Sequence, residues 1–303
     1  MERAHPIPVS GRRPHMSFAR ARASVEPADL FAGAEATAPV DGIRVGIGGW
    51  TYAPWRSNFY PAGLVQRREL EYASRQLSAI EINGTFYGAQ KPATYARWAA
   101  ETPDGFMFAL KAPQYVTQRG PLAKAGGAAA AFVSGGLAEF GDRLGPLLWQ
   151  LPPSRMFDRD DLATFLDALP RALDGMPLRH VLEVRNDSFR SEDYLALARD
   201  HRIATVFTDS PDYPSLADIT GDFVYARLMR SQAPVDTGYP AEALAAWAQR
   251  AREWAHGGDP AELPHVGEPL AQAPPREVFV FFISAAKQRN PAAAMALIER
   301  LRR

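Results

Sequence analysis

Charged side chains interrupt several short apolar runs of this sequence, close to the carboxyl end of each run. Glu81 and Glu183 lie in two such runs. Among the cations, Arg185 shares the run of Glu183, and Lys111 and Arg227 lie in two further runs. Because an unpaired buried charge is costly, charges in these positions favour a functional pocket. The two glutamates could act as a general acid and base, provided that burial and the cations separate their pKa values. The cations could hold a phosphate or a carboxylate, which arginine binds in bidentate fashion.

Further polar and aromatic residues stand at comparable positions. Asp209 ends an apolar run and joins Glu81, Glu183 and Lys111 as a candidate catalytic residue. Aromatic rings near the run ends could stack on a sugar or a base. The candidate substrate-binding residues are Trp50, Tyr52, Asn83, Thr85, Tyr87, Gln150, Arg185 and Arg227. A competing interpretation is that the charges pair with one another and close this end of the fold, and that the aromatic rings only pack.

The same residues leave other chemistry open. A Mg²⁺ or Mn²⁺ site made of Glu81, Glu183 and Asp209 is one alternative, which the interleaved cations disfavour. A Schiff base on Lys111 is another, and we expect acidic neighbours to keep the pKa of this lysine too high for it. The sequence has no cysteine, and none of its six histidines stands at the carboxyl end of a run. We therefore predict no metal and no cofactor.

Eight apolar runs of strand length must position these residues. The runs cover residues 43–50, 78–87, 106–113, 145–153, 178–186, 203–210, 222–230 and 277–285. Amphipathic stretches with helical spacing separate most of them. This alternation predicts an α/β fold, a (β/α)₈ TIM barrel in one domain, whose strands present the site at their carboxyl ends. An open doubly wound sheet is the alternative, but it rarely needs eight units, and the glycine fingerprint of dinucleotide binding is missing.

Two connections depart from the repeat. Residues 210–221 hold prolines and leave little room for a helix, so the sixth helix is expected to be irregular. Residues 256–277 form a long, proline-rich connection before the last strand. In a barrel we expect this segment on the bottom face, away from the chemistry, as a loop for stability or for a partner.

Residues 1–40 differ from the rest of the chain, because they are rich in Arg, Ala and Pro and show no sustained period. They lack the apolar stretch of a secretory signal. An organelle transit peptide or an over-long start with Met16 as the true initiator would also fit. We favour a disordered basic tail followed by the barrel over residues 41–303.

The composition narrows the classes of function. The 303 residues include 34 Lys+Arg and 34 Asp+Glu, so the formal net charge is zero. A general basic surface for nucleic acid is therefore not indicated, although a local patch stays open. No apolar run reaches the roughly 18 residues of a membrane span. The absence of cysteine fits a reducing compartment, and we expect a cytoplasmic protein.

Several motifs taken together resemble one known family. They are IGGWTYAPWRSNFYP (47–61), EINGTFY (81–87), KPATYARWAAETPDGFMFALKAP (91–113), GPLLWQLPP (145–153), EVRNDSF (183–189) and FVYARL (223–228). In this order they are similar to the YecE-like family, domain-of-unknown-function family 72. The resemblance covers the chain from about Ile43 onward. It implies a (β/α)₈ barrel and no established activity.

The resemblance also carries site positions. The recurrent polar residues of the family correspond here to Glu81, Asn83, Thr85, Tyr87, Lys111, Gln150, Glu183, Arg185, Asp209 and Arg227. The chain departs from the family at Gln118, where a histidine is frequent, and at Phe189, where a tryptophan is usual. It also departs at residues 282–284, where relatives often carry asparagines.

Three functions remain as hypotheses. The first is an enzyme, a hydrolase, lyase or isomerase, that acts on an anionic small molecule or a sugar by carboxylate acid–base chemistry. The second is a barrel that cleaves the phosphodiesters of nucleic acid, which would need a basic groove. The third is a non-catalytic module that binds a ligand or a partner at the carboxyl ends of the strands.

Overall fold

The computed structural model of the protein describes residues 37–303, and these residues form a closed barrel of eight parallel strands. In chain order the strands are β1 (Ile43–Gly48), β2 (Ala79–Ile82), β3 (Met107–Lys111), β4 (Leu144–Gln150), β7 (His180–Glu183), β8 (Ala204–Thr208), β9 (Phe223–Leu228) and β10 (Glu277–Phe282). β10 pairs with β1 and closes the ring. Each strand lies within one of the eight predicted runs or starts one residue before it, so the prediction of a TIM barrel is confirmed.

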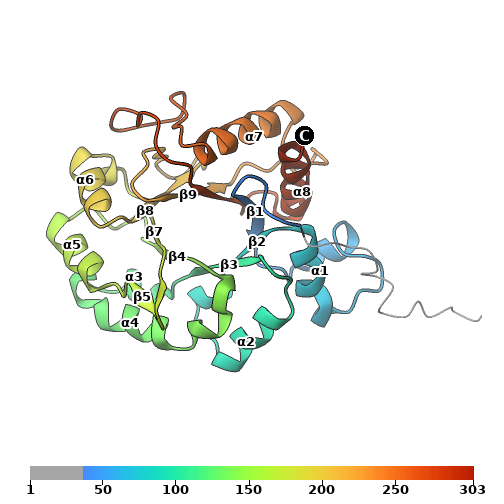
Figure 1. Cartoon of the computed structure of the whole chain (residues 1–303), viewed down its shortest axis with the longest axis horizontal. Coiled ribbons are helices and arrows are strands. Elements are labelled where there is room, and N and C mark those ends of the chain that lie inside the picture. The colour runs from blue at the N-terminus through green and yellow to red at the C-terminus, as the bar shows by residue number, and fades with distance from the viewer. Residues whose placement is uncertain (1–36) are drawn as a thin grey trace, which may run out of the picture. The chain divides into compact units, whose positions relative to one another are not determined.

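Helices surround the ring of strands (Figure 1). They are α1 (Glu69–Gln76), α2 (Pro92–Ala100), α3 (Gln114–Thr117), α4 (Gly126–Ser134), α5 (Arg159–Ala168), α6 (Glu192–Asp200), α7 (Ala241–Ala255) and α8 (Asn290–Leu301). Short 3-10 helices span Ala53–Ser57, Gln66–Arg68, Gly84–Phe86, Leu122–Lys124, Leu137–Arg143, Asp187–Phe189 and Lys287–Arg289. β5 (Ala172–Leu173) and β6 (Met176–Pro177) form a small separate hairpin. No helix in residues 37–303 is long and apolar enough to cross a membrane.

Local sequence signals explain where several helices begin. The Asp158 carboxylate accepts hydrogen bonds from two backbone N–H groups of the first turn of α5, and the Ser191 hydroxyl caps α6 in the same way. Proline occupies the first turn of α2 and of α8, where no intrahelical donor is lost. These signals determine where the outer helices begin.

The core has two layers, because successive side chains of a strand point to opposite faces. The larger layer lies between the strands and the helices. The smaller one fills the barrel and consists of Ala79, Ala109, Leu148, Val181, Ala204, Val206, Phe223, Tyr225, Phe279, Phe281 and Ile283. Small residues from β2, β3 and β8 thus face large aromatic ones from β9 and β10. This filled interior leaves the two ends of the barrel for polar side chains. Arg44 and Glu277 form an ion pair at the amino end, and the predicted site residues lie at the carboxyl end.

No helix lies between β8 and β9, as the prolines there predicted. The connection from α7 to β10 packs against this segment instead. The Pro264 carbonyl accepts a hydrogen bond from the Ala217 N–H, and the Asp218 carboxylate accepts bonds from the N–H groups of Val266 and Gly267. Leu263 of the same connection reaches a cavity at the carboxyl end of β8. The prediction that this connection stays on the bottom face is therefore wrong for its middle part, which occupies the place of the missing helix.

The tail predicted over residues 1–40 falls outside the described residues up to residue 36. Of the remaining four residues of that range, Thr37 and Val40 contact the barrel. Val40 forms a bridge with Ile43, and the Thr37 hydroxyl donates to the Arg75 carbonyl.

Candidate functional site

The strands place five charged or polar side chains above the apolar layer inside the barrel. They are Glu81 from β2, Lys111 from β3, Gln150 from β4, Glu183 from β7 and Arg227 from β9. Each stands two residues beyond a lining residue of its strand, so its side chain points to the same interior face. We call these five residues, together with Arg185, the mouth cluster.

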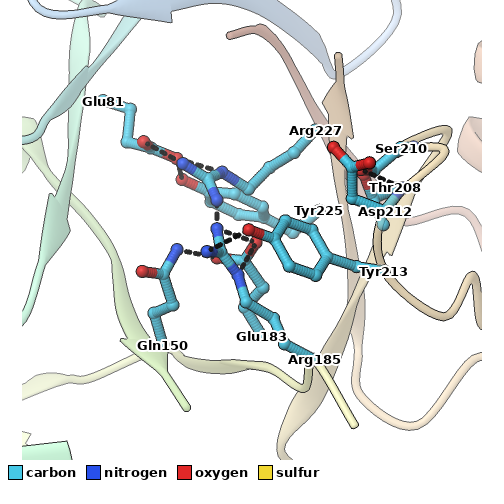
Figure 2. A network of polar contacts seen from close by, with 10 residues as sticks. All are labelled: Glu81, Gln150, Glu183, Arg185, Thr208, Ser210, Asp212, Tyr213, Tyr225 and Arg227. Atoms are coloured by element: carbon cyan, nitrogen blue, oxygen red, sulfur yellow. Dashed lines mark hydrogen bonds and ion pairs between the residues drawn. The ribbon is translucent and has the colours of Figure 1, made fainter. Parts of the chain in front are cut away.

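Arg227 lies at the centre of the mouth cluster and joins its two carboxylates (Figure 2). Its Nε and Nη2 donate to the two oxygens of Glu81 at 3.1 and 3.0 Å, which is a bidentate pair. Its Nη1 donates to Glu183 Oε2 at 2.5 Å. Each of the three side chains is at most 3% exposed. Three of the five guanidinium donors, one on each nitrogen, therefore hold the two glutamates.

Glu183 receives donors on both of its oxygens. Gln150 lies opposite it in the register of β4 and β7, and its amide donates to Oε2 at 2.5 Å. Arg185 donates to Oε1 through Nε at 3.1 Å and through Nη2 at 2.9 Å. Burial would raise the pKa of Glu183, but Arg227 and Arg185 outweigh burial and lower this pKa to about 2. Glu183 therefore stays ionised at neutral pH, the form that can accept a proton.

Glu81 has an additional donor that the sequence reasoning missed. The buried Tyr225 hydroxyl donates to Glu81 Oε2 at 2.8 Å. Burial and the Glu81 charge raise the pKa of Tyr225 well above its usual value, so the phenol keeps its proton. Tyr225 precedes Arg227 by two residues in the same strand, and this spacing could have identified it.

Arg185 lies on the outer side of the mouth cluster. Its guanidinium carbon stands 4.1 Å from the ring centre of Tyr213, and its Nη1 donates to the Tyr213 hydroxyl at 3.1 Å. The Arg185 side chain is 16% exposed, so part of it reaches solvent. Tyr213 comes from the irregular segment after β8, where no periodic signal marks it.

Lys111 is the cation of the mouth cluster that has no carboxylate partner. Its Nζ lies 3.7 Å from the ring centre of Phe86, and it takes part in no hydrogen bond or ion pair with residues 37–303. Burial and the nearby Arg227 lower the pKa of Lys111 to about 8, against the opposite effect of Glu81 and Glu183. The expectation that acidic neighbours keep this pKa high is therefore wrong, because burial and Arg227 outweigh the two carboxylates.

Asp209 does not join the mouth cluster, although it was a candidate catalytic residue. It follows Thr208 by one residue and so points away from the barrel interior. Its carboxylate accepts hydrogen bonds from the Met229 N–H at 2.5 Å and the Tyr239 hydroxyl at 3.0 Å. Burial raises the pKa of Asp209. It lines a cavity of about 410 Å³ that also contacts Trp247 of α7, outside the ring of strands.

The remaining predicted binding residues take separate places. Trp50 packs against Trp98 of α2, with ring centres 4.9 Å apart, so it belongs to the outer layer. Tyr52 lies under the amine of Lys287, 4.7 Å from its ring centre to Nζ. Tyr87 is 79% exposed beyond β2.

Two of the predicted binding residues support their neighbours. The Thr85 hydroxyl is buried and donates to the Lys111 carbonyl at 2.7 Å, so it positions the lysine. Asn83 is half-buried and packs against Gly48, where an added Cβ would stand 2.8 Å from the Asn83 Nδ2.

Among residues 37–303 no group of three or more His, Asp or Glu residues could hold a metal ion. His180 stands at the amino end of β7 in the outer layer, where its Nδ1 accepts a hydrogen bond from Trp149 Nε1 at 3.0 Å. Burial lowers the pKa of His180 to about 4, so the ring is neutral at pH 7. Both carboxylates of the mouth cluster are bound by arginine, and this donor set does not suit a divalent cation.

Comparisons with known proteins give the same fold. Residues 44–303 match the family model described as "Protein of unknown function DUF72". A DUF72 family protein of Thermotoga maritima has a crystal structure that is 20% identical, with a TM-score of 0.65, covering 86% of this chain and 99% of that one. A DUF72 family protein of Enterococcus faecalis is 16% identical, with a TM-score of 0.63, covering 86% and 96%. The UPF0759 protein YunF of Bacillus subtilis is 30% identical over 82 residues, which are 26% of this chain and 28% of that protein.

Proposed function

The chain belongs to DUF72, a family of unknown function, and from its mouth cluster we propose an enzyme that binds an anionic small molecule and moves a proton through Lys111. The observation that carries this proposal is the Lys111 amine, which is buried over Phe86 without a carboxylate partner. A chain that needed only a filled barrel would place an apolar side chain here, since an unpaired buried cation lowers stability.

Unused hydrogen-bond donors support an anionic ligand. Lys111 has three N–H donors, and none of them is bonded to a residue in the described part of the chain. Arg185 has five donors, of which two bind Glu183 and one binds Tyr213. The remaining donors belong to the two cations of the mouth cluster that reach furthest toward solvent. A phosphate or carboxylate group would satisfy them by charge-assisted hydrogen bonds.

The proton-transfer role follows from the acidity of Lys111. With a pKa of about 8, roughly one amine in ten is neutral at pH 7, against roughly one in 2,500 for an ordinary lysine. General acid–base catalysis is most efficient when the pKa of the group lies near the working pH. In this proposal Glu81 and Glu183 act indirectly, because they hold the arginines in place and do not themselves transfer protons.

A test of this function uses ligand-induced stabilisation together with a turnover screen. The ligands are phosphate, dicarboxylates and sugar phosphates, and the proteins are wild type, Lys111→Met, Arg185→Met and the matched control Lys124→Met, whose lysine is exposed. A ligand at about 100 times its Kd stabilises by about 2.7 kcal/mol, which raises Tm by roughly 5–10 °C. We expect this rise in wild type and Lys124→Met, and its loss in the other two variants.

A second candidate function is a non-catalytic binding module. The observation that favours it is the closed pairing of Arg227 with both glutamates, which leaves neither carboxylate free for proton transfer. Binding without any product in the screen would favour this candidate and contradict the enzyme. Product formation that persists in Lys111→Met would contradict the role proposed for Lys111.

A further inference from the structure

The composition of basic residues makes Lys111 unusual within its own chain. Among 34 Lys+Arg the sequence has four lysines, at positions 91, 111, 124 and 287. The other two cations of the mouth cluster are arginines. An arginine at position 111 would also bind an anion, but it cannot lose its proton in a protein. A primary amine at this place offers a nucleophile, which a guanidinium does not.

The surroundings of the Lys111 amine suit a nucleophile. The ring of Phe86, 3.7 Å from the amine nitrogen, attracts the ammonium form, whereas burial and Arg227 favour the neutral amine. Within residues 37–303 no carboxylate forms an ion pair with this lysine. The Lys111 residue is 9% exposed, so part of it reaches solvent at the carboxyl end of β3. The Thr85 hydroxyl fixes the Lys111 carbonyl at the end of β3. This bond fixes the backbone from which the partly exposed Lys111 side chain extends.

We propose that the Lys111 amine attacks the carbonyl carbon of an anionic aldehyde or ketone and forms an imine with it. This inference rests on the anion site of the proposed function, and it adds a covalent step and a substrate class. The negative group of the substrate lies on the free donors of Arg185, which leaves the carbonyl carbon to Lys111.

The step balances without a further reactant. The nitrogen lone pair forms the N–C bond, the carbonyl π electrons move to oxygen, and one amine proton is transferred to that oxygen. The resulting carbinolamine loses water, formed from its hydroxyl group and a second proton, and leaves a C=N bond. In its protonated form this bond withdraws electrons from the neighbouring carbon, which assists proton removal or C–C cleavage there. The lowered pKa of Lys111 supplies the neutral amine that the attack needs.

Reductive trapping tests the proposal directly. The folded full-length protein is incubated with glyoxylate, which carries a carboxylate, or with the neutral aldehyde glycolaldehyde, and sodium cyanoborohydride fixes any imine. Peptide mass spectrometry then assigns the label among the four lysines and the terminal amine. We expect glyoxylate to label Lys111 about tenfold or more faster than the exposed Lys124, because more of its amine is neutral. Glycolaldehyde should show a much smaller preference for Lys111.

Variants separate the covalent step from anion binding. Lys111→Arg keeps the charge and should lose the label. Arg185→Met should slow labelling by glyoxylate about tenfold, and labelling by glycolaldehyde much less, because loss of the Arg185 charge only raises the pKa of Lys111 while loss of its donors removes the carboxylate site. Lys287 is the most demanding control, because burial also lowers its pKa. Label on Lys287 or Lys124 at the rate of Lys111 would overturn the proposal. This assignment uses the wild-type chain and does not depend on the folding of a variant.

The outcome also distinguishes the two proposals. If Lys111 stays unlabelled while anions still stabilise the wild type but not Lys111→Met, the covalent step is refuted and the proposed function stands. If no anion stabilises the protein through Lys111 and no label appears, both proposals fail. Label on Lys111 without anion-dependent stabilisation would support the amine chemistry and contradict the anion site.

Discussion

Replacement of Glu183 by glutamine tests whether the mouth cluster is the ion-pair network described above. The substitution keeps the size of the side chain and removes its charge, so Arg227 and Arg185 both lose their shared partner. Removal of one partner from a buried ion pair typically costs about 3–5 kcal/mol, because it leaves a buried charge uncompensated. We therefore expect Glu183→Gln to lower the free energy of unfolding by this amount at pH 7.

The pH dependence gives an independent estimate. The pKa of Glu183 falls from an unfolded value of about 4.5 to about 2 in the folded protein. The ionised carboxylate therefore contributes its full stability above about pH 4.5 and loses it as the pH falls toward 2. At about 1.4 kcal/mol for each pKa unit, this contribution is roughly 3 kcal/mol, in agreement with the first estimate.

Urea unfolding of both proteins at pH 7, 5 and 3 measures the effect. The difference between wild type and Glu183→Gln should be constant between pH 7 and 5 and should shrink clearly at pH 3. Glu262→Gln is the matched control, since its exposed pair with Arg250 should be worth less than about 1 kcal/mol. A loss at pH 7 below about 1 kcal/mol, or a loss that does not change with pH, would refute the description of a charged, buried network.

Two further predictions concern the loss of stability caused by the buried Lys111 cation and the anchoring of residues 266–267 by Asp218. Lys111→Met should raise the free energy of unfolding at pH 7 by about 1–3 kcal/mol. The pKa of Lys111 is about 8 in the folded protein and 10.5 in the unfolded one, so at pH 7 the protonated amine destabilises the folded wild type, and this loss is recovered only as the pH rises from 8 to 10.5. Chemical denaturation at pH 7 checks it, and an unchanged or lowered midpoint would contradict the buried cation. Asp218→Ala should speed hydrogen exchange of the Val266 and Gly267 amides about tenfold or more, because both lose their acceptor. If Lys111 is labelled at the same rate in Asp218→Ala and in wild type, residues 266–267 do not influence the mouth cluster. Unchanged hydrogen exchange of the two amides would disprove that Asp218 anchors this loop.

The apolar runs and the charges inside them were enough to predict most of the mouth cluster. Glu81, Lys111, Gln150, Glu183 and Arg227 all stand inside strands, where alternation decides which face a side chain occupies. The rule holds only while the strand continues. It placed the side chains of these five residues together because each strand extends to the residue in question.

The errors arose where the strands end. Asp209 is one residue out of phase with the lining side chains, so it faces α7 and not the interior. Trp50 follows Gly49, whose φ of +75° turns the chain away from the direction of β1. Tyr213 comes from an irregular segment, and no period in that segment indicates that it covers Arg185.

The sequence by itself determined the family, the barrel and the types of group at its carboxyl end, because periodicity and strand order are local properties of the chain. Only the tertiary structure decided which charges pair. Arg227 takes both glutamates, and Lys111 is left over Phe86 without a partner. A pKa depends on distances and burial in three dimensions, so the change of Lys111 from an ordinary cation to a candidate nucleophile could not be obtained from the order of residues.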